Sequence, residues 1–333
     1  MNKKLISVSM AGASIIGYFT GMSVERYWNP VSAAQPLLMD MTPSQVILGG
    51  DELLKPQDRL KSQRIQEIMR HGWPSLDPIR TYDNFVLSYN RKYRTANWVY
   101  EHLTPEIVNN KQVDRTRSDF YEDNSIHPYF RSSLIDYRES GFDRGHLAPA
   151  GNHRISQNTM DQTFVLSNIS PQVGVGFNRD AWNYLEQYVR FRAVRSKNTW
   201  ICTGPLYLPR IEQDGKTYVK YQVIGKNHVA VPTHFFKVLL VENMDGRFDL
   251  ESYLMPNTVI DSQIPLRAFQ VPIDSIERSS GFLVFEGLNK SYISTFNSNH
   301  KFVDKFQQRL WDEKLKQEKL LREKGEQKRL MIG

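Results

Sequence analysis

The feature that most constrains the fold is a series of short apolar runs between residues 199 and 254, separated by glycine, proline and charged residues. The runs are 199–203, 218–224, 229–231, 234–241 and 250–254. Short runs of β-branched and aromatic residues bounded by turn residues are typical of strands. Two more such runs, 85–89 and 97–100, flank a polar turn. The sequence therefore predicts a strand-rich domain.

Helical periodicity is restricted to a few places. Trp182, Leu185 and Val189 recur at i, i+3 and i+7 within residues 180–195, which predicts an amphipathic helix. A second helix is expected at the start of 301–333, where the apolar face fades and a charged tail follows. A short helix is expected at 66–71, a long polar surface loop at 109–140, and strand ends at 142–147 and 164–168.

The N-terminal segment, residues 1–30, has the pattern of a targeting or anchor sequence. Lys3 and Lys4 precede residues 5–24, which carry no charge. Twenty helical residues span about 30 Å, enough to cross a bilayer. A mitochondrial transit segment or membrane anchor, a cleaved secretory signal and a buried core helix are the alternatives, and the position behind two lysines favours targeting or anchoring. Residues 31–74, rich in proline, are expected to be a linker and lead-in.

Charge and cysteine content narrow the chemistry. The lone Cys202 excludes an intramolecular disulfide and a multi-cysteine zinc site. The net charge of +7 is concentrated at the termini, because residues 31–300 are close to neutral. Within the body, residues 144–197 hold a local excess of arginine and lysine, which suits a polyanionic partner.

Residues 141–154, which read GFDRGHLAPAGNHR, carry the densest group of reactive side chains. A lone histidine in a turn is more often structural than catalytic. His146, however, is followed by Asn168, by Asn178 and then by Glu186 on the predicted helix. The presence of these polar residues after His146 favours a catalytic role for the histidine.

These pieces resemble the DNA/RNA non-specific endonuclease family, in particular its mitochondrial endonuclease G-like branch. The matching blocks are Asp143-Arg144-Gly145-His146, Ser167-Asn168 with Pro171-Gln172, 178–182 with Glu186, 204–209, 221–225 and 229–238. The resemblance covers about residues 75–290 and places a nuclease domain at 75–300. It implies an α+β fold with a central antiparallel sheet and an inserted ββα-metal (His-Me finger) module. It also implies sugar-non-specific cleavage of DNA and RNA, a homodimer, a mitochondrial location and a part in nucleic-acid degradation, including that of cell death.

The resemblance further implies that His146 is the general base and that Asn178 holds one divalent cation. The chemistry agrees with both roles. An imidazole with an ordinary pKa of about 6.5 can accept the proton of the attacking water, so activity should fall on acidification. A hard cation on an amide oxygen keeps several waters, offsets the charge of the departing oxygen and can protonate it, which favours Mg²⁺ or Mn²⁺ over zinc.

The remaining candidates are a carboxylate, three arginines and an amide. Glu186 lies about 12 Å along the helix from Asn178, so it is expected to hold a metal-bound water, with an ion pair to Arg190 as the alternative. Arg144, two residues from His146, is expected to hold the scissile phosphate or to form a salt bridge. The list closes with Arg115 as a second phosphate ligand, Arg117 as its competitor, and Asn168 as a substrate contact or a strand-end cap.

One departure from the branch keeps alternatives open. Residues 173–177 are one residue longer than expected, so Asn183 is a fallback metal ligand and His153 a fallback base. The competing function classes are a non-catalytic nucleic-acid binder, a membrane-tethered interaction protein acting through residues 301–333, and a secreted scavenging nuclease.

Overall fold

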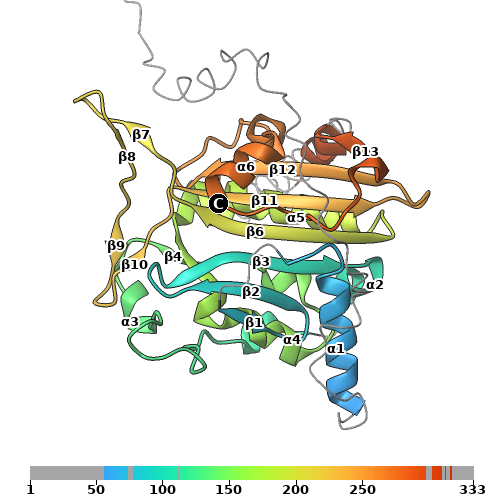
Figure 1. Cartoon of the computed structure of the whole chain (residues 1–333), viewed down its shortest axis with the longest axis horizontal. Coiled ribbons are helices and arrows are strands. Elements are labelled where there is room, and N and C mark those ends of the chain that lie inside the picture. Colours follow the sequence, from blue (N-terminus) through green and yellow to red (C-terminus); the bar gives the residue numbers. More distant parts are fainter. Residues whose placement is uncertain are drawn as a thin grey trace, which may run out of the picture. The chain divides into compact units, whose positions relative to one another are not determined.

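A mixed sheet forms the centre of the computed structural model, with its strands in the order β1-β2-β3-β6-β11-β12-β13 (Figure 1). The strands are β1 (Ile79–Thr81), β2 (Phe85–Asn90), β3 (Thr95–Leu103), β6 (Asn198–Leu206), β11 (His234–Glu242), β12 (Phe248–Pro256) and β13 (Ile293–Phe296). Neighbouring strands run antiparallel except β12 and β13, which are parallel. The structure describes residues 56–73, 78–110, 113–297, 302–309, 312 and 316.

Both faces of the sheet are covered, which explains why its central strands are continuous apolar runs. On one face Leu87 and Val99 pack with Leu185 of helix α5 (Asn183–Ala193). On the other face Val86 and Trp200 pack with helices α1 (Pro56–Ile68) and α6 (Ile273–Ser280). The domain therefore has three layers, and α5 lies on the face that carries the candidate site.

Shorter elements connect these layers. The helices are α2 (Pro105–Asn109), α3 (Leu134–Tyr137) and α4 (Gln157–Asp161), with 3₁₀ turns η2 (Arg115–Arg117), η3 (Ala150–Asn152), η4 (Gln162–Phe164), η5 (Leu166–Asn168), η7 (Leu266–Phe269) and η8 (Lys290–Tyr292). Strand β4 (Asp143–His146) pairs with β5 (Ile169–Gln172), β7 (Arg210–Ile211) with β8 (Thr217–Tyr218), and β9 (Val223–Ile224) with β10 (Val229–Ala230). The last two pairs lie at the side of the main sheet (Figure 1).

Most predicted strands are confirmed, with two differences. The run 218–224 is split between β8 and β9. The strand end expected at 164–168 is instead a pair of 3₁₀ turns, and the strand begins at Ile169. The reason is the side chain of Asn168, which donates to the carbonyl oxygens of Ala148 and Thr163 and so closes a turn.

The two ends of the described chain belong to the packed body. Helix α1 begins at Pro56, inside the stretch expected to be a linker and lead-in, and packs on the sheet. Residues 302–309 form the expected terminal helix, with Val303 and Phe306 buried against α5. Among the described residues, no helix has the length and apolar character needed to cross a membrane. The predicted targeting segment and most of the charged tail lie outside those residues.

Candidate active site

Strands β4 and β5 and the helix that follows them form the strand–strand–helix module that the resemblance implied. In the antiparallel pair, Gly145 faces Ser170 and His146 faces Ile169. A Cβ on Gly145 would lie 2.1 Å from Oε1 of Gln172, whose side chain is fully buried. The glycine between Arg144 and His146 is therefore required by the close approach of β5.

The helix that carries Asn178 begins after a sharp turn. Gly176 has a φ of +85°, and its N–H donates to Oδ2 of Asp180 at 2.6 Å. The segment η6 (Gly174–Trp182) is π-helical, is broken at Val175 and Gly176, and continues into α5. The extra residue expected within 173–177 is accommodated by the left-handed turn at Gly176, and Asn178 lies near the start of the helix.

The amide of Asn178 is oriented by Asp143 on β4. Asn178 Nδ2 lies 2.8 Å from Asp143 Oδ2, and a carboxylate can only accept, so the amide oxygen faces away from it. Arg179 also donates to Asp143, from Nε at 2.8 Å and from Nη2 at 2.6 Å. The hydrogen bonds from Arg179 are the main cause of the lowered pKa of Asp143. An ionised Asp143 thus keeps the Asn178 oxygen available as a ligand.

One cavity of about 450 Å³ brings most of the predicted site residues together. Its lining includes His146, Asn178, Asn183, Glu186, Arg115, Arg144, Arg154 and Arg190. Arg117 does not line it. An imidazole, an amide, a carboxylate and several guanidinium groups therefore share a single space, which suits an anionic ligand.

His146 is held neutral by its surroundings. Its ring centroid lies 5.3 Å from that of Phe120 and 4.8 Å from that of Phe164. Burial, followed by the charge of Arg115, lowers the pKa of His146 to about 3. Nε2 has no hydrogen-bond partner among the described residues. A neutral ring with a free nitrogen can accept a proton, and it stays neutral at lower pH than an ordinary histidine.

Glu186 is partly buried, and burial raises its pKa, while the charges of Lys237 and Arg190 act in the opposite direction. No ion pair between Glu186 and Arg190 forms within the described chain, so the alternative of a surface ion pair is not supported. Arg190 instead donates from Nη1 to Asn152 Oδ1 at 3.1 Å.

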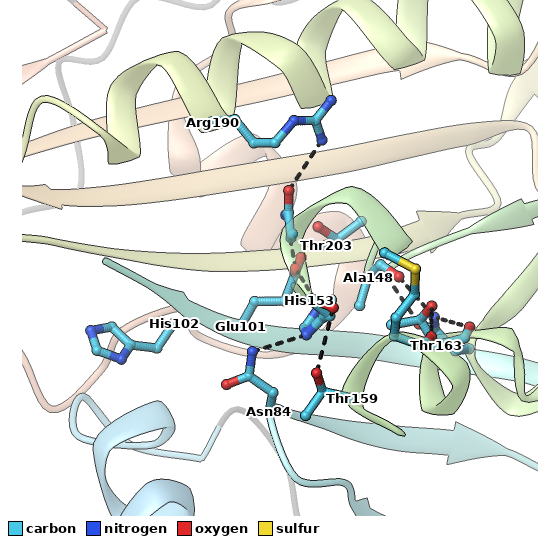
Figure 2. Close-up of polar contacts among 12 residues, drawn as sticks. Asn84, Glu101, His102, Ala148, His153, Thr159, Thr163, Arg190 and Thr203 are labelled. Atoms are coloured by element: carbon cyan, nitrogen blue, oxygen red, sulfur yellow. Dashed lines mark hydrogen bonds and ion pairs between the residues drawn. The ribbon is translucent and has the colours of Figure 1, made fainter. Parts of the chain in front are cut away.

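Below Arg190, a buried hydrogen-bonded network runs across the sheet (Figure 2). Glu101 of β3 has no exposed surface, and its Oε1 accepts from Asn152 Nδ2 at 2.9 Å. The same Oε1 lies 3.0 Å from His153 Nε2, whose Nδ1 lies 3.1 Å from Asn84 Nδ2. His153 is therefore an internal residue, away from the cavity, and the fallback role as a base has no geometric support.

Hydrogen-bond donation in this network converges on the carboxylate of Glu101 from two ends, Arg64 of helix α1 and Arg190 of helix α5. Arg64 can only donate, and its Nε lies 2.7 Å from Asn84 Oδ1. Asn84 must then present its NH₂ group to Nδ1 of His153, which leaves the ring proton on Nε2, facing Glu101. Every group in this path has one possible role, so the path is ordered.

Two arginines of the cavity lie on aromatic rings. The guanidinium carbon of Arg144 is 4.4 Å from the ring centroid of Phe120, and that of Arg115 is 5.9 Å from the centroid of Phe164. Among the described residues, Arg144 forms no salt bridge with Asp143 or Glu186, and Arg115 forms none either. The structural role considered for Arg144 is therefore not supported. Both charges are available for an anion.

Asn168 is not brought to the cavity. Its side chain is fully buried, and its Oδ1 accepts from the Ala148 N–H at 2.9 Å while Nδ2 donates to two carbonyl oxygens. All of its polar capacity is used by the backbone beside β4. The strand-end role is supported by this placement, and a substrate contact is not.

The donors of the cavity fit a hard cation. Within the described chain, no group of three or more His, Cys, Asp or Glu side chains is arranged to hold a metal ion. The amide oxygen of Asn178, turned away from Asp143, and the carboxylate of Glu186 line the same cavity. Few protein oxygens and no sulfur suit an ion that retains much of its water, such as Mg²⁺.

The module and its cavity are those of a nuclease of the ββα-metal class, and comparison with known proteins agrees. The model of the DNA/RNA non-specific endonuclease family matches residues 66–291, and the chain belongs to that family. The chain is therefore a metal-dependent nuclease, a hydrolase of nucleic acids.

Individual relatives are similar over most of the chain. It is 54% identical over 301 residues to "Endonuclease G, mitochondrial" of Caenorhabditis elegans, covering 89% of this chain and 96% of that one. It is 54% identical over 217 residues to the human protein of the same name, covering 65% and 72% of the two chains. A crystal structure of an EndoG/EndoGI complex matches with 55% identity and a TM-score of 0.70, over 71% of this chain and 96% of that one.

Sequence reasoning missed several residues that shape the site. The sequence places Arg190 in the basic stretch 144–197 and as an alternative partner of Glu186, but does not predict it as a residue of the site, although it lies on the same helix face one turn further on. Glu101 was visible as a lone carboxylate beside the apolar run 97–100, which is a sign of a buried, partnered acid. The role of Asp143 in orienting Asn178 joins residues 35 apart and had no local sign.

Proposed function

We propose that His146 is the general base for hydrolysis of a phosphodiester and that Asn178 holds the divalent cation. The main support for this proposal is that His146, whose Nε2 has no hydrogen-bond partner among the described residues, and Asn178 line one cavity together with several arginines. Nε2 takes the proton of a water molecule as the water oxygen attacks phosphorus, while the bond from phosphorus to the departing ester oxygen breaks and that oxygen takes a proton from water in the cavity. The imidazole is neutral before this step because burial and Arg115 disfavour its charged form.

Arg144 and Arg115 bind the non-bridging oxygens of the scissile phosphate and stabilise the charge that develops on them. Their stacking on Phe120 and Phe164 supports this role, because it limits the positions that each guanidinium can take. Arg190, held by Asn152, is directed into the same cavity. Mg²⁺, or Mn²⁺ in its place, supplies further positive charge near the departing oxygen when bound.

Glu186 and Asp143 hold the surroundings of the cation. Asp143 orients the Asn178 amide through its hydrogen bond with Nδ2, and Glu186 presents a carboxylate that can accept from water in the cavity. Binding of DNA and RNA depends mainly on phosphate contacts, because the cavity is lined by arginines and a nuclease of this family does not read sequence.

The relatives' names support a mitochondrial location, and we place this chain in the intermembrane space or on the inner membrane. Residues 1–30 act as its targeting or anchor segment, and the chain works as a homodimer in nucleic-acid degradation, including that of cell death. Subcellular fractionation of the tagged full-length chain separates this proposal from a secreted nuclease. Light scattering on the purified protein tests the dimer.

Cleavage of supercoiled plasmid by the full-length chain tests the assignments. We expect nicking with Mg²⁺ and none with EDTA, and loss of nicking in His146→Ala and Asn178→Ala. His127→Ala is the matched control, because His127 is exposed and does not line the cavity. Asn183→Ala tests the alternative ligand inside the same cavity. If His146→Ala cleaves the plasmid at the parental rate, His146 is not the general base. If cleavage is lost in Asn183→Ala but kept in Asn178→Ala, Asn183 and not Asn178 is the metal ligand.

A further inference from the structure

A second hollow of about 660 Å³ adjoins the catalytic cavity. The two share Arg115, Arg144, Asn178 and Arg179 in their linings. The second hollow continues away from His146 and is lined on that side by Leu134, Phe120, Tyr137, Phe142 and Arg138. A ligand that lies across Arg144 therefore reaches both spaces.

Arg138 is the cation that belongs to the second hollow alone. It follows helix α3 directly, and its N–H donates to the carbonyl oxygen of Ile135 at 3.3 Å. Its side chain is exposed and makes no hydrogen bond or ion pair with any of the described residues. The charge of Arg138 is thus free for a ligand.

The backbone that carries Arg138 is held in place. Asp136 of α3 accepts from the N–H and the hydroxyl of Ser133, at 2.7 and 2.8 Å. It also accepts from Asn227 Nδ2, at 2.8 Å. Tyr137, the last residue of α3, is buried and its hydroxyl donates to the carbonyl oxygen of Ile169 on β5. Arg138 is therefore fixed relative to the catalytic module rather than placed on a loose loop.

The charges of the second hollow favour an anion. Asp143 is its acidic lining residue, and this carboxylate already accepts from Asn178 and from Arg179. Arg115, Arg138 and Arg144 remain without an ion pair among the described residues. Phe120, Phe142 and Leu134 add apolar surface, which can contact a sugar or a base without reading its hydrogen-bonding edge.

We propose that this hollow is a subsite for the nucleotide next to the scissile phosphate, and that Arg138 binds the phosphate of that nucleotide. The inference rests on the proposed function, which puts the scissile phosphate in the first cavity. A nucleic-acid strand carries a phosphate at every nucleotide, so a strand held at Arg144 presents its next phosphate along the direction of the shared lining. The contact reads no base, in keeping with non-specific cutting.

Substrate length provides the test, with the full-length protein and Mg²⁺. One substrate is thymidine 5′-(p-nitrophenyl phosphate), which offers a single diester and fills the catalytic cavity alone. The other is a single-stranded 12-nucleotide DNA. For Arg138→Ala we expect KM for the 12-nucleotide DNA to rise about 3- to 10-fold, with kcat kept and the small diester unaffected. The dependence of log binding on log salt should fall by about 0.7, as expected for one lost single-strand phosphate contact.

Two variants complete the design. Arg138→Lys should recover part of the affinity for the 12-nucleotide DNA, because it keeps the charge. Arg278→Ala is the matched control, since Arg278 lies on α6 with a highly exposed side chain and lines neither hollow. Unchanged kinetics of Arg138→Ala on the 12-nucleotide DNA, or an equal loss on both substrates, would overturn the subsite. Hydrolysis of the small diester by His146→Ala reports on the proposed function separately.

Discussion

Replacement of Asp143 by alanine should weaken binding of the divalent cation, although Asp143 is not proposed as a ligand. The carboxylate accepts from Asn178 Nδ2 at 2.8 Å and so fixes which atom of the amide faces the cavity. A hydrogen bond to a charged acceptor contributes about 1.5–3 kcal/mol. Loss of a partner that orients a ligand typically lowers metal affinity about 10- to 100-fold. The two values agree, because ten-fold in affinity corresponds to about 1.4 kcal/mol.

The assay is titration of the protein with Mn²⁺, followed by calorimetry, and titration of plasmid cleavage with Mg²⁺. Arg179→Ala is the control, because it removes both hydrogen bonds from the guanidinium to Asp143 and leaves the bond to Asn178. The side chain of Arg179 is 63% exposed, so this ion pair should contribute only about 0.2–1 kcal/mol. An Arg179→Ala protein that loses as much affinity as Asp143→Ala, or an Asp143→Ala protein with parental affinity, would refute the reasoning.

Three further predictions concern the surroundings of the base and the floor of the site. In a pH–rate profile, the pH below which kcat/KM falls should lie well below the ordinary histidine pKa of about 6.5, because burial and the charge of Arg115 lower the pKa of His146 to about 3. Arg115→Gln removes that charge and should shift this fall in kcat/KM to a higher pH. Gly145→Ala should cost about 1–3 kcal/mol in urea unfolding, because the new methyl group meets the side chain of Gln172, and parental stability would contradict the packing described. Glu101→Ala should lower stability by about 3–5 kcal/mol by leaving its two buried donors unpartnered, while Glu101→Gln, which retains an acceptor, should lose much less in the same unfolding assay; equal losses would argue against the hydrogen-bonded role.

The sequence was sufficient for the features that depend on local pattern. Short apolar runs bounded by turn residues predicted the central strands, and the spacing of Trp182, Leu185 and Val189 predicted α5. The grouping of His146 and Asn178 followed from motifs that also fix their place in the strand–strand–helix module. Both residues line one cavity.

What the sequence could not give depends on contacts between distant segments. Asn168 belongs to the motif, but its side-chain amide forms hydrogen bonds with the backbone of Ala148 and Thr163. These contacts cannot be predicted from the sequence. The depressed pKa of His146 likewise comes from burial between two aromatic rings and from a distant arginine, so acid sensitivity near pH 6.5, which an ordinary histidine predicts, is not expected.

The ordered path from Arg64 to Arg190 has a consequence for maturation of the polypeptide. One of its two end donors, Arg64, lies on α1, upstream of the segment that the family model matches, and the other, Arg190, lines the catalytic cavity. Removal of α1 would leave Asn84 Oδ1 without its donor, although the carboxylate of Glu101, which can only accept, would still hold the ring proton of His153 on Nε2. A proteolytic cut beyond Arg64 would therefore leave a buried amide oxygen near the floor of the cavity without its donor, which limits how far the chain can be shortened from its N-terminal side without destabilising the site.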